Sequence, residues 1–457
     1  MKRIVVLGGG FGGIAAAQRL DRRFRFDDDD IEIELVSDTN YVVYTPMLAD
    51  VAGGTIEPRH AVPPVRAFLK KARFREATVQ GIDVANQTAY GTLIDGTRGE
   101  MHYDYLVIAL GGVTNYSHAT GAAEHTLGLK DLFDAIRVRN RALTLLEWAN
   151  ATRDPALRQE LLTFVMAGGG FSGVEGIAAL EDLLHGALRY YPDIRPDELR
   201  FILAPHGKRL LEEVDERLGE YVVEKFSQRT IDVRLGVGVT DVTARSATLT
   251  TGEVIPTRTV IWTAGIKVNP VLHNVDLPKD KHGALQVNNQ LQVLDHPTIY
   301  ALGDCAAVPT PDGQGFYAPT AQNAIREGPV AAANITAAIR NTGLTKTFAY
   351  KPVGSLASLG NRQAVAQIGD LRLSGLPAWF AWRGIYLAKL PTVADKVRVG
   401  LDWLTNLFAP VDTVQIPIIR ENLADTEARL LLSGAAPAAA ATPDQPPMSS
   451  SLATGAG

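Results

Sequence analysis

Short apolar runs recur along the chain, and each ends in glycine or another small residue. The first run lies in residues 2–13, KRIVVLGGGFGG, and IAAAQRL follows it. This pattern predicts a buried strand, a tight turn and then a helix. A second apolar run, IEIELV, occupies residues 31–36. Together these segments predict one β-α-β unit.

The same pattern restarts about 160 residues later. Residues 161–184, LLTFVMAGGGFSGVEGIAALEDLL, repeat the strand, glycine turn and helix, and residues 199–205 supply the next strand. Three further runs that end in small residues are expected to be strands: 103–112, 258–265 and 298–306. The chain therefore predicts an α/β protein with two Rossmann-type dinucleotide-binding domains.

The pattern changes after residue 345. Residues 346–375 alternate like antiparallel strands, and residues 379–408 are predicted to be helical, with Trp, Leu and Tyr interspersed with Lys and Arg. From about residue 434 the composition is of low complexity and predicts disorder. The acidic run at residues 27–30 is expected to be a solvated loop, since contiguous carboxylates rarely converge on one metal ion.

Composition excludes several functions for this chain of 457 residues. A net charge of −5 argues against a nucleic-acid partner. No apolar stretch is long enough to cross a bilayer, and the N-terminal apolar run is too short for a secretory signal. The single cysteine, Cys305, excludes an internal disulfide and a redox-active cysteine pair. We expect no metal site.

The two glycine turns carry the first chemical prediction. Each has the spacing G-x-G-x-x-G, in which the first glycine permits a tight turn and the second lets the backbone approach a diphosphate. The third lets the helix pack closely on the strand. We expect two dinucleotides to bind here. The residues expected to bind them are Gly8, Gly10, Phe11, Gly12 and Gly13 in the first turn and Gly168, Gly170, Phe171, Ser172 and Gly173 in the second.

A dinucleotide site usually has an acid at the end of its second strand, which binds a ribose hydroxyl. For the first site Glu34 and Asp38 are near, but Ser37 holds the expected position. For the second site the strand ends in basic side chains and no acid: His206, Lys208 and Arg209. These cations either accommodate a 2′-phosphate or lie on a solvated loop, so the nucleotide is NADH or NADPH.

Two acids outside the glycine turns are candidate functional residues. Asp304, at the end of a strand, either binds the hydroxyls of a flavin's ribityl chain or caps the next helix. Glu175, at the start of the second glycine-turn helix, either complements the helix dipole or lies beside the stacked nicotinamide and flavin. In the second role it orients the nicotinamide carboxamide or relays protons.

The ordered set of motifs resembles one family. GGGFGG, NYVVYTPML, YDYLVIALGG, GGGFSGVE, TVIWTAG, ALGDCA and PTAQNAIREG occur as in type II NADH:quinone oxidoreductases, which are alternative NADH dehydrogenases. The resemblance covers residues 1 to about 410. It implies a glutathione-reductase-like fold with bound FAD, which passes a hydride from NAD(P)H to the flavin and two electrons to a membrane quinone, without proton pumping.

The resemblance also assigns roles to single residues. Glu175 matches a glutamate near the nicotinamide and flavin, and Asp304 matches the flavin-binding aspartate. Ala321 and Gln322 match an Ala-Gln pair on the quinone-facing side of the flavin, and Pro46 matches a proline close to the ring. The expected FAD site also includes Ser37, Asp38 and Gly111, and the expected NAD(P)H site includes His206 and Gly265.

Three positions depart from the family pattern. Arg326 stands where the family commonly has a second glutamine, and Glu327 follows it. In the NADH module the usual acid after the second strand is missing, and Pro205 stands near its place. In the FAD module Ser37 stands at the position of the corresponding acid. Arg326 is expected to stabilise an anionic reduced flavin or to bind a charged acceptor. The expected catalytic residues are therefore Glu175, Gln322 and Arg326. Two alternatives remain: an NAD(P)H dehydrogenase with a non-quinone acceptor, and an NAD(P)H-sensing flavoprotein with little turnover.

The family also predicts where the protein works. We expect a peripheral protein on the cytoplasmic side of the cell membrane that reduces menaquinone or ubiquinone. The residues expected to enter the bilayer interface are Trp379, Phe380, Trp382, Ile385, Tyr386 and Leu390, and those expected to meet acidic headgroups are Arg383, Lys389 and Lys396. A homodimer interface is the alternative use of this segment.

The expected domains follow from these motifs. They are 1–113 for the first part of an FAD-binding domain, 114–264 for an NAD(P)H-binding domain, 265–345 for the second part of the FAD-binding domain, 346–430 for C-terminal strands and amphipathic helices, and 431–457 for a disordered tail.

Overall fold

The largest sheet joins segments that are far apart in the sequence. In the computed structural model, which describes residues 1–25 and 30–416, this sheet has eight strands in the order β17-β18-β6-β1-β2-β3-β4-β5. Strand β1 (Lys2–Leu7) pairs in parallel with β2 (Ile31–Ser37) and with β6 (Tyr105–Ile108). Strand β18 (His296–Ala301) then pairs in parallel with β6. The sheet is therefore completed only by residues from the second half of the chain.

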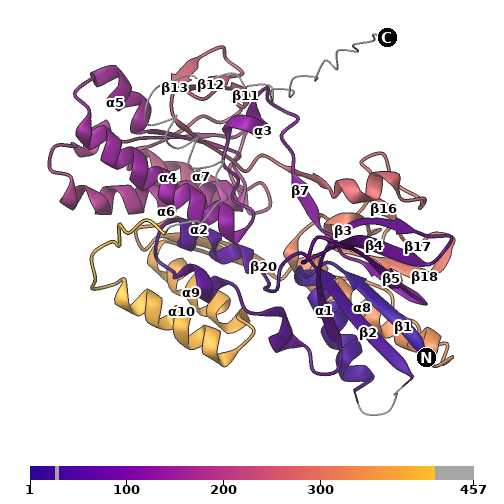
Figure 1. The fold of residues 1–457 in the computed structure, drawn as a ribbon. Coiled ribbons are helices and arrows are strands. Elements are labelled where there is room, and N and C mark those ends of the chain that lie inside the picture. The colour runs from indigo at the N-terminus through magenta and orange to yellow at the C-terminus, as the bar shows by residue number, and fades with distance from the viewer. Residues whose placement is uncertain (26–29, 417–457) are drawn as a thin grey trace, which may run out of the picture. The chain divides into compact units, whose positions relative to one another are not determined.

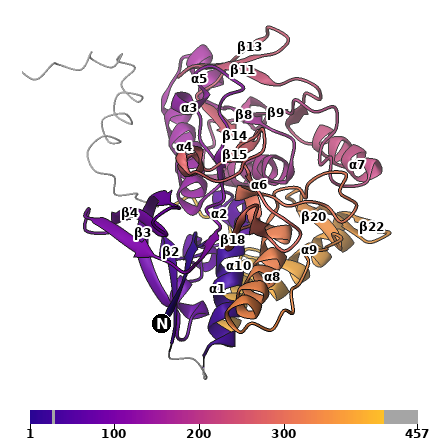
Figure 2. The same ribbon diagram turned by 90° about the vertical axis from the view of Figure 1, so that its right-hand side faces the viewer.

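Two helices cover this sheet side by side. Helix α1 (Phe11–Arg23) follows the first glycine turn, and α8 (Ala321–Ile339) returns from the later segment (Figure 2). They approach closely because Gly328 has no side chain: a Cβ there would lie 2.6 Å from the carbonyl oxygen of Gly12 and 2.7 Å from the nitrogen of Ala16. This contact holds the middle of α8 against the first turns of α1.

A second, fully parallel sheet contains the other glycine turn. Its order is β10 (Ile231–Val233), β9 (Arg200–Ala204), β8 (Thr163–Ala167) and β14 (Thr259–Trp262). Helix α6 (Phe171–Ala187) follows β8 as α1 follows β1. The expectation of two Rossmann-type units is confirmed, because all of the predicted strands form.

A two-stranded ribbon lies where the chain passes between the two sheets. Strand β7 (Gly112–Thr114) leads away from the eight-stranded sheet (Figure 1). Strand β15 (Ile266–Val268) pairs antiparallel with it. The hydrogen-bonded register places Thr114 opposite Ile266. The two segments that connect the two sheets therefore lie side by side.

The C-terminal segment forms a three-stranded antiparallel sheet and two helices, as its pattern predicts. The strands are β20 (Gly354–Ser358), β21 (Ala364–Ile368) and β22 (Leu371–Ser374), and the helices are α9 (Gly375–Lys389) and α10 (Val393–Thr405). In the described part of the chain, no helix is both long and apolar enough to cross a bilayer. The predicted disordered tail and residues 27–29 of the acidic run lie outside the described residues.

The remaining elements complete the two units. The strands are β3 (Arg73–Asp83), β4 (Thr88–Leu93), β5 (Arg98–His102), β11 (Val239–Val242), β12 (Ser246–Leu249), β13 (Val254–Pro256), β16 (Leu285–Gln286), β17 (Gln292–Val293) and β19 (Ala306–Ala307). The α-helices are α2 (Leu48–Ala52), α3 (Ala122–His125), α4 (Leu132–Ala151), α5 (Pro155–Leu161) and α7 (Glu216–Ser227). The 3-10 helices are η1 (Thr45–Met47), η2 (Pro58–Ala61), η3 (Val65–Phe68), η4 (Leu188–Tyr190), η5 (Pro196–Glu198), η6 (Pro270–Asn274) and η7 (Gly303–Cys305).

Candidate functional site

The two glycine turns have nearly the same geometry. Gly8 has φ +107° and Gly168 has φ +118°, backbone conformations that side chains disfavour. A Cβ at Gly13 would collide with the carbonyl of Gly8, and a Cβ at Gly173 would collide with the carbonyl of Gly168. These first and third glycines are therefore required by the backbone itself, as the motif predicts.

The helices after both turns begin without a side-chain cap. Gly10 and Gly170 are the N-cap residues of α1 and α6, and neither helix start receives a side-chain hydrogen bond. Five other α-helices are capped by a carboxylate or hydroxyl, namely Asp131 on α4, Asp154 on α5, Asp215 on α7, Thr320 on α8 and Thr392 on α10, whereas α2, α3 and α9 also begin without a side-chain cap. A Cβ at Gly10 or Gly170 would meet nothing within 4 Å. Each turn thus presents free backbone N–H groups to open space, an arrangement suited to phosphate.

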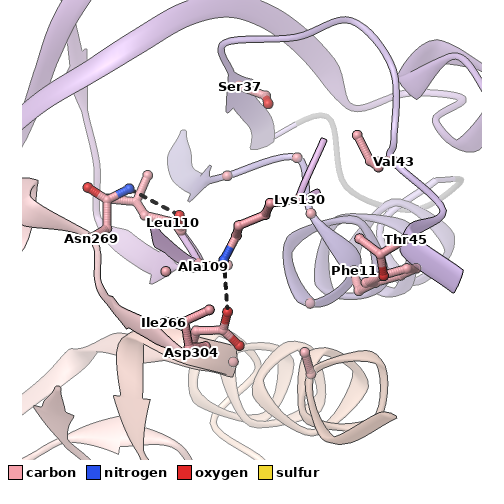
Figure 3. Close-up of a pocket in the computed structure, with 18 of the residues that line it drawn as sticks. Phe11, Ser37, Val43, Thr45, Ala109, Leu110, Lys130, Ile266, Asn269 and Asp304 are labelled. Atoms are coloured by element: carbon pink, nitrogen blue, oxygen red, sulfur yellow. Dashed lines mark hydrogen bonds and ion pairs between the residues drawn. The ribbon is translucent and has the colours of Figure 1, made fainter. Parts of the chain in front are cut away.

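A cavity of about 630 Å³ lies at the carboxyl ends of β1, β2 and β6 (Figure 3). The expected FAD residues that line it are Gly8, Gly10, Phe11, Gly12, Ser37, Asp38, Gly111, Asp304 and Ala321. Two expected NAD(P)H residues, Ser172 and Gly265, also line it. Those outside its lining are Gly13, Pro46, Gln322, Arg326, Gly168, Gly170, Phe171, Gly173, Glu175 and His206. The cavity is therefore shared between the two glycine-turn units.

Three charged side chains line this cavity among the described residues: Asp38, Lys130 and Asp304. Lys130 was not predicted from the sequence. Its signal was its place directly after the apolar residues TLGL and before Asp131, the N-cap of α4. Asp304 likewise follows an apolar run, that of β18.

Glu327 holds the turn that carries Asp304. Its Oε2 accepts a hydrogen bond from the backbone N–H of Gly303 at 2.6 Å, and its side chain is buried. Burial raises the pKa of Glu327 to about 7. The sequence showed this acid only as the neighbour of Arg326, because the contact joins α8 to a turn 24 residues away.

Glu175 lies one helical turn beyond Ser172 on α6 and is 7% exposed. Its Oε1 accepts hydrogen bonds from the backbone N–H of Ser358 at 2.8 Å and from Trp382 Nε1 at 3.0 Å. Burial raises the pKa of Glu175 to about 8, and the nearby charge of Asp50 adds to this. The carboxyl therefore holds its proton at neutral pH.

Asp50, on α2, is the second acid of this region. Thr55 Oγ1 donates a hydrogen bond of 2.5 Å to its Oδ1. Burial raises the pKa of Asp50 to about 6, whereas Thr55 and the charge of Arg383 lower it. Two acids with different pKa values thus lie near each other, the arrangement typical of proton transfer.

Gln322 and Arg326 lie on the first turns of α8, outside the cavity. The Gln322 amide donates to the carbonyl of Gly354 at 3.0 Å and accepts from Tyr350 Oη at 3.1 Å. Arg326 Nη1 donates to the carbonyl of Gln322 at 2.7 Å, and its guanidinium lies 4.0 Å from the centre of the Tyr350 ring. Lys389 is close enough that Arg326 contributes to lowering its pKa, after burial. This end of α8 is therefore cationic.

Cys305 is buried, and its Sγ donates to the carbonyl of Gly111 at 3.4 Å. Burial raises the pKa of the Cys305 thiol to about 12. A thiol that stays protonated is a poor nucleophile, so thiolate chemistry at this residue is excluded near neutral pH.

The basic residues after β9 do not form one cluster. His206 and Lys208 are exposed, whereas Arg209 turns inward and donates to the carbonyls of Glu212 and Val214 at 3.2 and 3.1 Å. The space beside Gly207 is filled by the carboxylate of Glu212. The loop after β9 therefore brings the carboxylate of Glu212 back to Gly207, near the end of that strand.

Half of the apolar residues expected at the bilayer interface are instead buried in the protein. Trp379, Trp382 and Leu390 are 7%, 2% and 2% exposed. Arg383, expected to meet headgroups, lies 3.9 Å from the ring centre of Trp379 and 4.9 Å from that of Trp403. The sequence prediction was wrong for these residues because α9 packs on β21, which a helical pattern alone does not reveal.

Comparisons with known proteins agree with this geometry. Residues 2–328 match the family described as pyridine nucleotide-disulphide oxidoreductase, and residues 353–410 match the NDH2 C-terminal domain. The chain is 31% identical over 424 residues to the type II NADH:quinone oxidoreductase Ndh of Mycobacterium tuberculosis, covering 89% of this chain and 88% of that protein. It is 33% identical over 408 residues to the demethylphylloquinone reductase NdbB of Synechocystis, covering 88% and 96%.

A solved structure shares the fold. The NDH2 of Plasmodium falciparum in complex with NADH superposes with a TM-score of 0.84 at 21% identity, covering 90% of this chain and 99% of that chain.

Proposed function

Since the chain belongs to the family of type II NADH:quinone oxidoreductases, we propose that it oxidises NADH or NADPH and reduces a quinone through bound FAD, without pumping protons. One NAD(P)H, one quinone and one proton give NAD(P)⁺ and a quinol. The observation that carries the proposal is the single cavity lined by both glycine-turn units. The chemistry that FAD supplies is acceptance of a hydride and return of two electrons.

The FAD residues are those of the first unit. The uncapped N-terminus of α1 at Gly10 would receive the diphosphate, and Ser37 and Asp38 would meet a ribose. Asp304 is fixed by Glu327 through Gly303, where it would bind the ribityl hydroxyls. The residues proposed for this site are Gly8, Gly10, Phe11, Gly12, Gly13, Ser37, Asp38, Pro46, Gly111, Asp304, Ala321 and Gln322.

The NAD(P)H residues are those of the second unit: Gly168, Gly170, Phe171, Ser172, Gly173, Glu175, His206 and Gly265. Arg209 turns inward, and the Glu212 carboxylate lies beside Gly207, shortly after the end of β9. A carboxylate there accepts hydrogen bonds from a ribose hydroxyl and repels a phosphate. We therefore propose that NADH is preferred over NADPH.

Glu175 is the proposed proton donor of the reaction. The reaction takes up one proton, and Glu175 holds one at neutral pH because burial raises its pKa to about 8. It lies one turn from Ser172, which lines the cavity. Gln322 and Arg326, with Ala321 at the cavity wall, are proposed for the quinone side.

The face of α9 and α10 that stays exposed is the proposed bilayer contact. Its apolar residues are Leu376, Phe380, Val393, Val397, Leu401 and Leu404, and Phe408 is exposed shortly after the end of α10. On α10 they recur at helical spacing, and Phe380 is 63% exposed. Such a face suits a peripheral membrane protein. We propose the cytoplasmic side of the cell membrane as its location and menaquinone or ubiquinone as its quinone. A homodimer that buries the same face is the alternative occupant.

The domain boundaries remain a proposal: 1–113 and 265–345 for FAD, 114–264 for NAD(P)H, and 346–430 for the C-terminal region. The β7–β15 ribbon supports the two inner boundaries, since it lies at residues 112–114 and 266–268.

The test of the function is an anaerobic titration. The purified protein, with its flavin confirmed by absorbance, receives one equivalent of NADH or NADPH and then menadione. We expect rapid bleaching, fastest with NADH, and rapid recovery on adding the quinone. Bleaching without recovery would exclude quinone as the acceptor, and absence of bound flavin would exclude the whole proposal.

A further inference from the structure

Lys130 is held from the NAD(P)H-side unit. The segment that precedes it is tied to β14: the N–H of Leu127 donates to the carbonyl of Val260 at 2.9 Å, and the N–H of Trp262 donates to the carbonyl of Leu127 at 2.7 Å. The N–H of Lys130 donates to Asp134 Oδ2 at 3.0 Å at the start of α4. Its backbone is therefore fixed on both sides, and only the side chain is free to move.

The side chain of Lys130 crosses the cavity toward the FAD-side unit (Figure 3). Its Nζ lies 4.0 Å from Asp304 Oδ2, with the two side chains 37% and 24% exposed. That distance exceeds a hydrogen bond, so the ammonium keeps its donors available. Burial lowers the pKa of Lys130, and the charge of Asp304 raises it.

The charges that line the cavity do not balance an incoming dinucleotide. Asp38 and Asp304 are carboxylates, and Lys130 is the one cation among the described lining residues. The diphosphate of FAD brings two further negative charges. The N-terminus of α1 supplies only about half a positive charge, so a full counter-ion is missing without the lysine.

We infer that Lys130 binds the diphosphate of FAD. The inference rests on the proposed function for its cofactor. On binding, the ammonium exchanges its loose contact with Asp304 for a charge-assisted hydrogen bond to a phosphate oxygen, which frees Asp304 for the ribityl hydroxyls. A residue of the NAD(P)H-side unit thereby holds the cofactor of the other unit.

The experiment compares flavins with and without phosphate. Apoproteins of the wild type, Lys130→Gln and Lys130→Arg are titrated with FAD and with riboflavin, followed by flavin fluorescence, at low and high salt. For Lys130→Gln we expect FAD affinity to fall about 10- to 100-fold, with riboflavin affinity unchanged. Lys130→Arg keeps most of the FAD affinity. Lys267→Gln, an exposed lysine on β15, is the matched control and keeps all of it.

Two outcomes overturn the inference. In the first, Lys130→Gln binds FAD as tightly as the wild type, and a shifted flavin midpoint potential would then place the lysine at the ring. In the second, the variant loses FAD and riboflavin affinity equally. Circular dichroism shows whether the variant folds. If it does not fold, the wild type alone still tests the inference, because its FAD affinity must fall with salt more steeply than its riboflavin affinity. If the wild type binds no FAD, the proposed function fails as well.

Discussion

Glu175→Gln should remove a loss of folding stability that grows with pH in the wild type. In the wild type, the folded carboxyl keeps its proton up to about pH 8, whereas the unfolded one releases it near 4.5. The folded state therefore binds more protons over this window, and stability falls as the pH rises through it. Glutamine keeps the shape and, through its amide oxygen, accepts the same hydrogen bonds from Ser358 and Trp382.

The magnitude follows from the two pKa values. Each unit of difference corresponds to about 1.4 kcal/mol, so the wild type loses about 4 kcal/mol between pH 5 and pH 9 that the variant does not lose. Thermal midpoints measured from pH 5 to pH 9 by differential scanning fluorimetry should diverge, with the variant progressively more stable by several degrees. At pH 5 the two proteins should differ least.

Glu198→Gln is the control of opposite sign. A hydrogen bond from Arg158 holds the pKa of Glu198 below its usual range, so its contribution to stability is present at neutral pH and is lost as the pH falls through the lowered value. This variant should be less stable than the wild type at pH 7, with the gap closing in acid. Parallel pH curves for the wild type and Glu175→Gln would refute the assignment of a raised pKa to Glu175.

Three further results are expected. Asp50→Asn removes a charge that raises the pKa of Glu175, so the alkaline limb of the pH profile of kcat should move to lower pH. A limb that does not move would show that the charge of Asp50 does not affect the pKa of Glu175. Gly173→Ala forces a Cβ into the second turn and should weaken NADH binding ~10-fold or more while the flavin content is kept, as measured by nucleotide titration. Leu401→Asp should reduce co-sedimentation with anionic liposomes, whereas Ile94→Asp, at a still more exposed residue in the turn after β4, should not. Retained binding by Leu401→Asp argues for the dimer instead.

The local pattern was enough to predict the strands and both glycine turns. Short buried strands and glycines with positive φ are dictated by neighbours in sequence, so Gly8 and Gly168 were found without tertiary information. The same holds for Asp304, whose strand-end position marked it.

Contacts between segments that are distant in the chain could not be predicted from the sequence. Glu327 reaches Gly303 across a helix, Lys130 reaches Asp304 between units, and the Glu212 carboxylate returns to Gly207 by a loop. The sequence predicted a helix with apolar residues at 379–408, but it did not show which of them would pack on β21. Trp379 and Trp382 were therefore placed in the bilayer although they are buried.

The position of β18 in the eight-stranded sheet has a consequence for the order of folding on the ribosome. Gly111 and Cys305, which touch at the ends of β6 and β18, are 194 residues apart. At roughly 5–20 residues per second, one edge of β6 stays unpaired for about 10–40 s after it is made. The four strands of the parallel sheet all lie inside that interval of the chain. The unit with the second glycine turn can therefore be complete while the apolar edge of β6 still awaits its partner, and during that time the nascent chain is most exposed to aggregation.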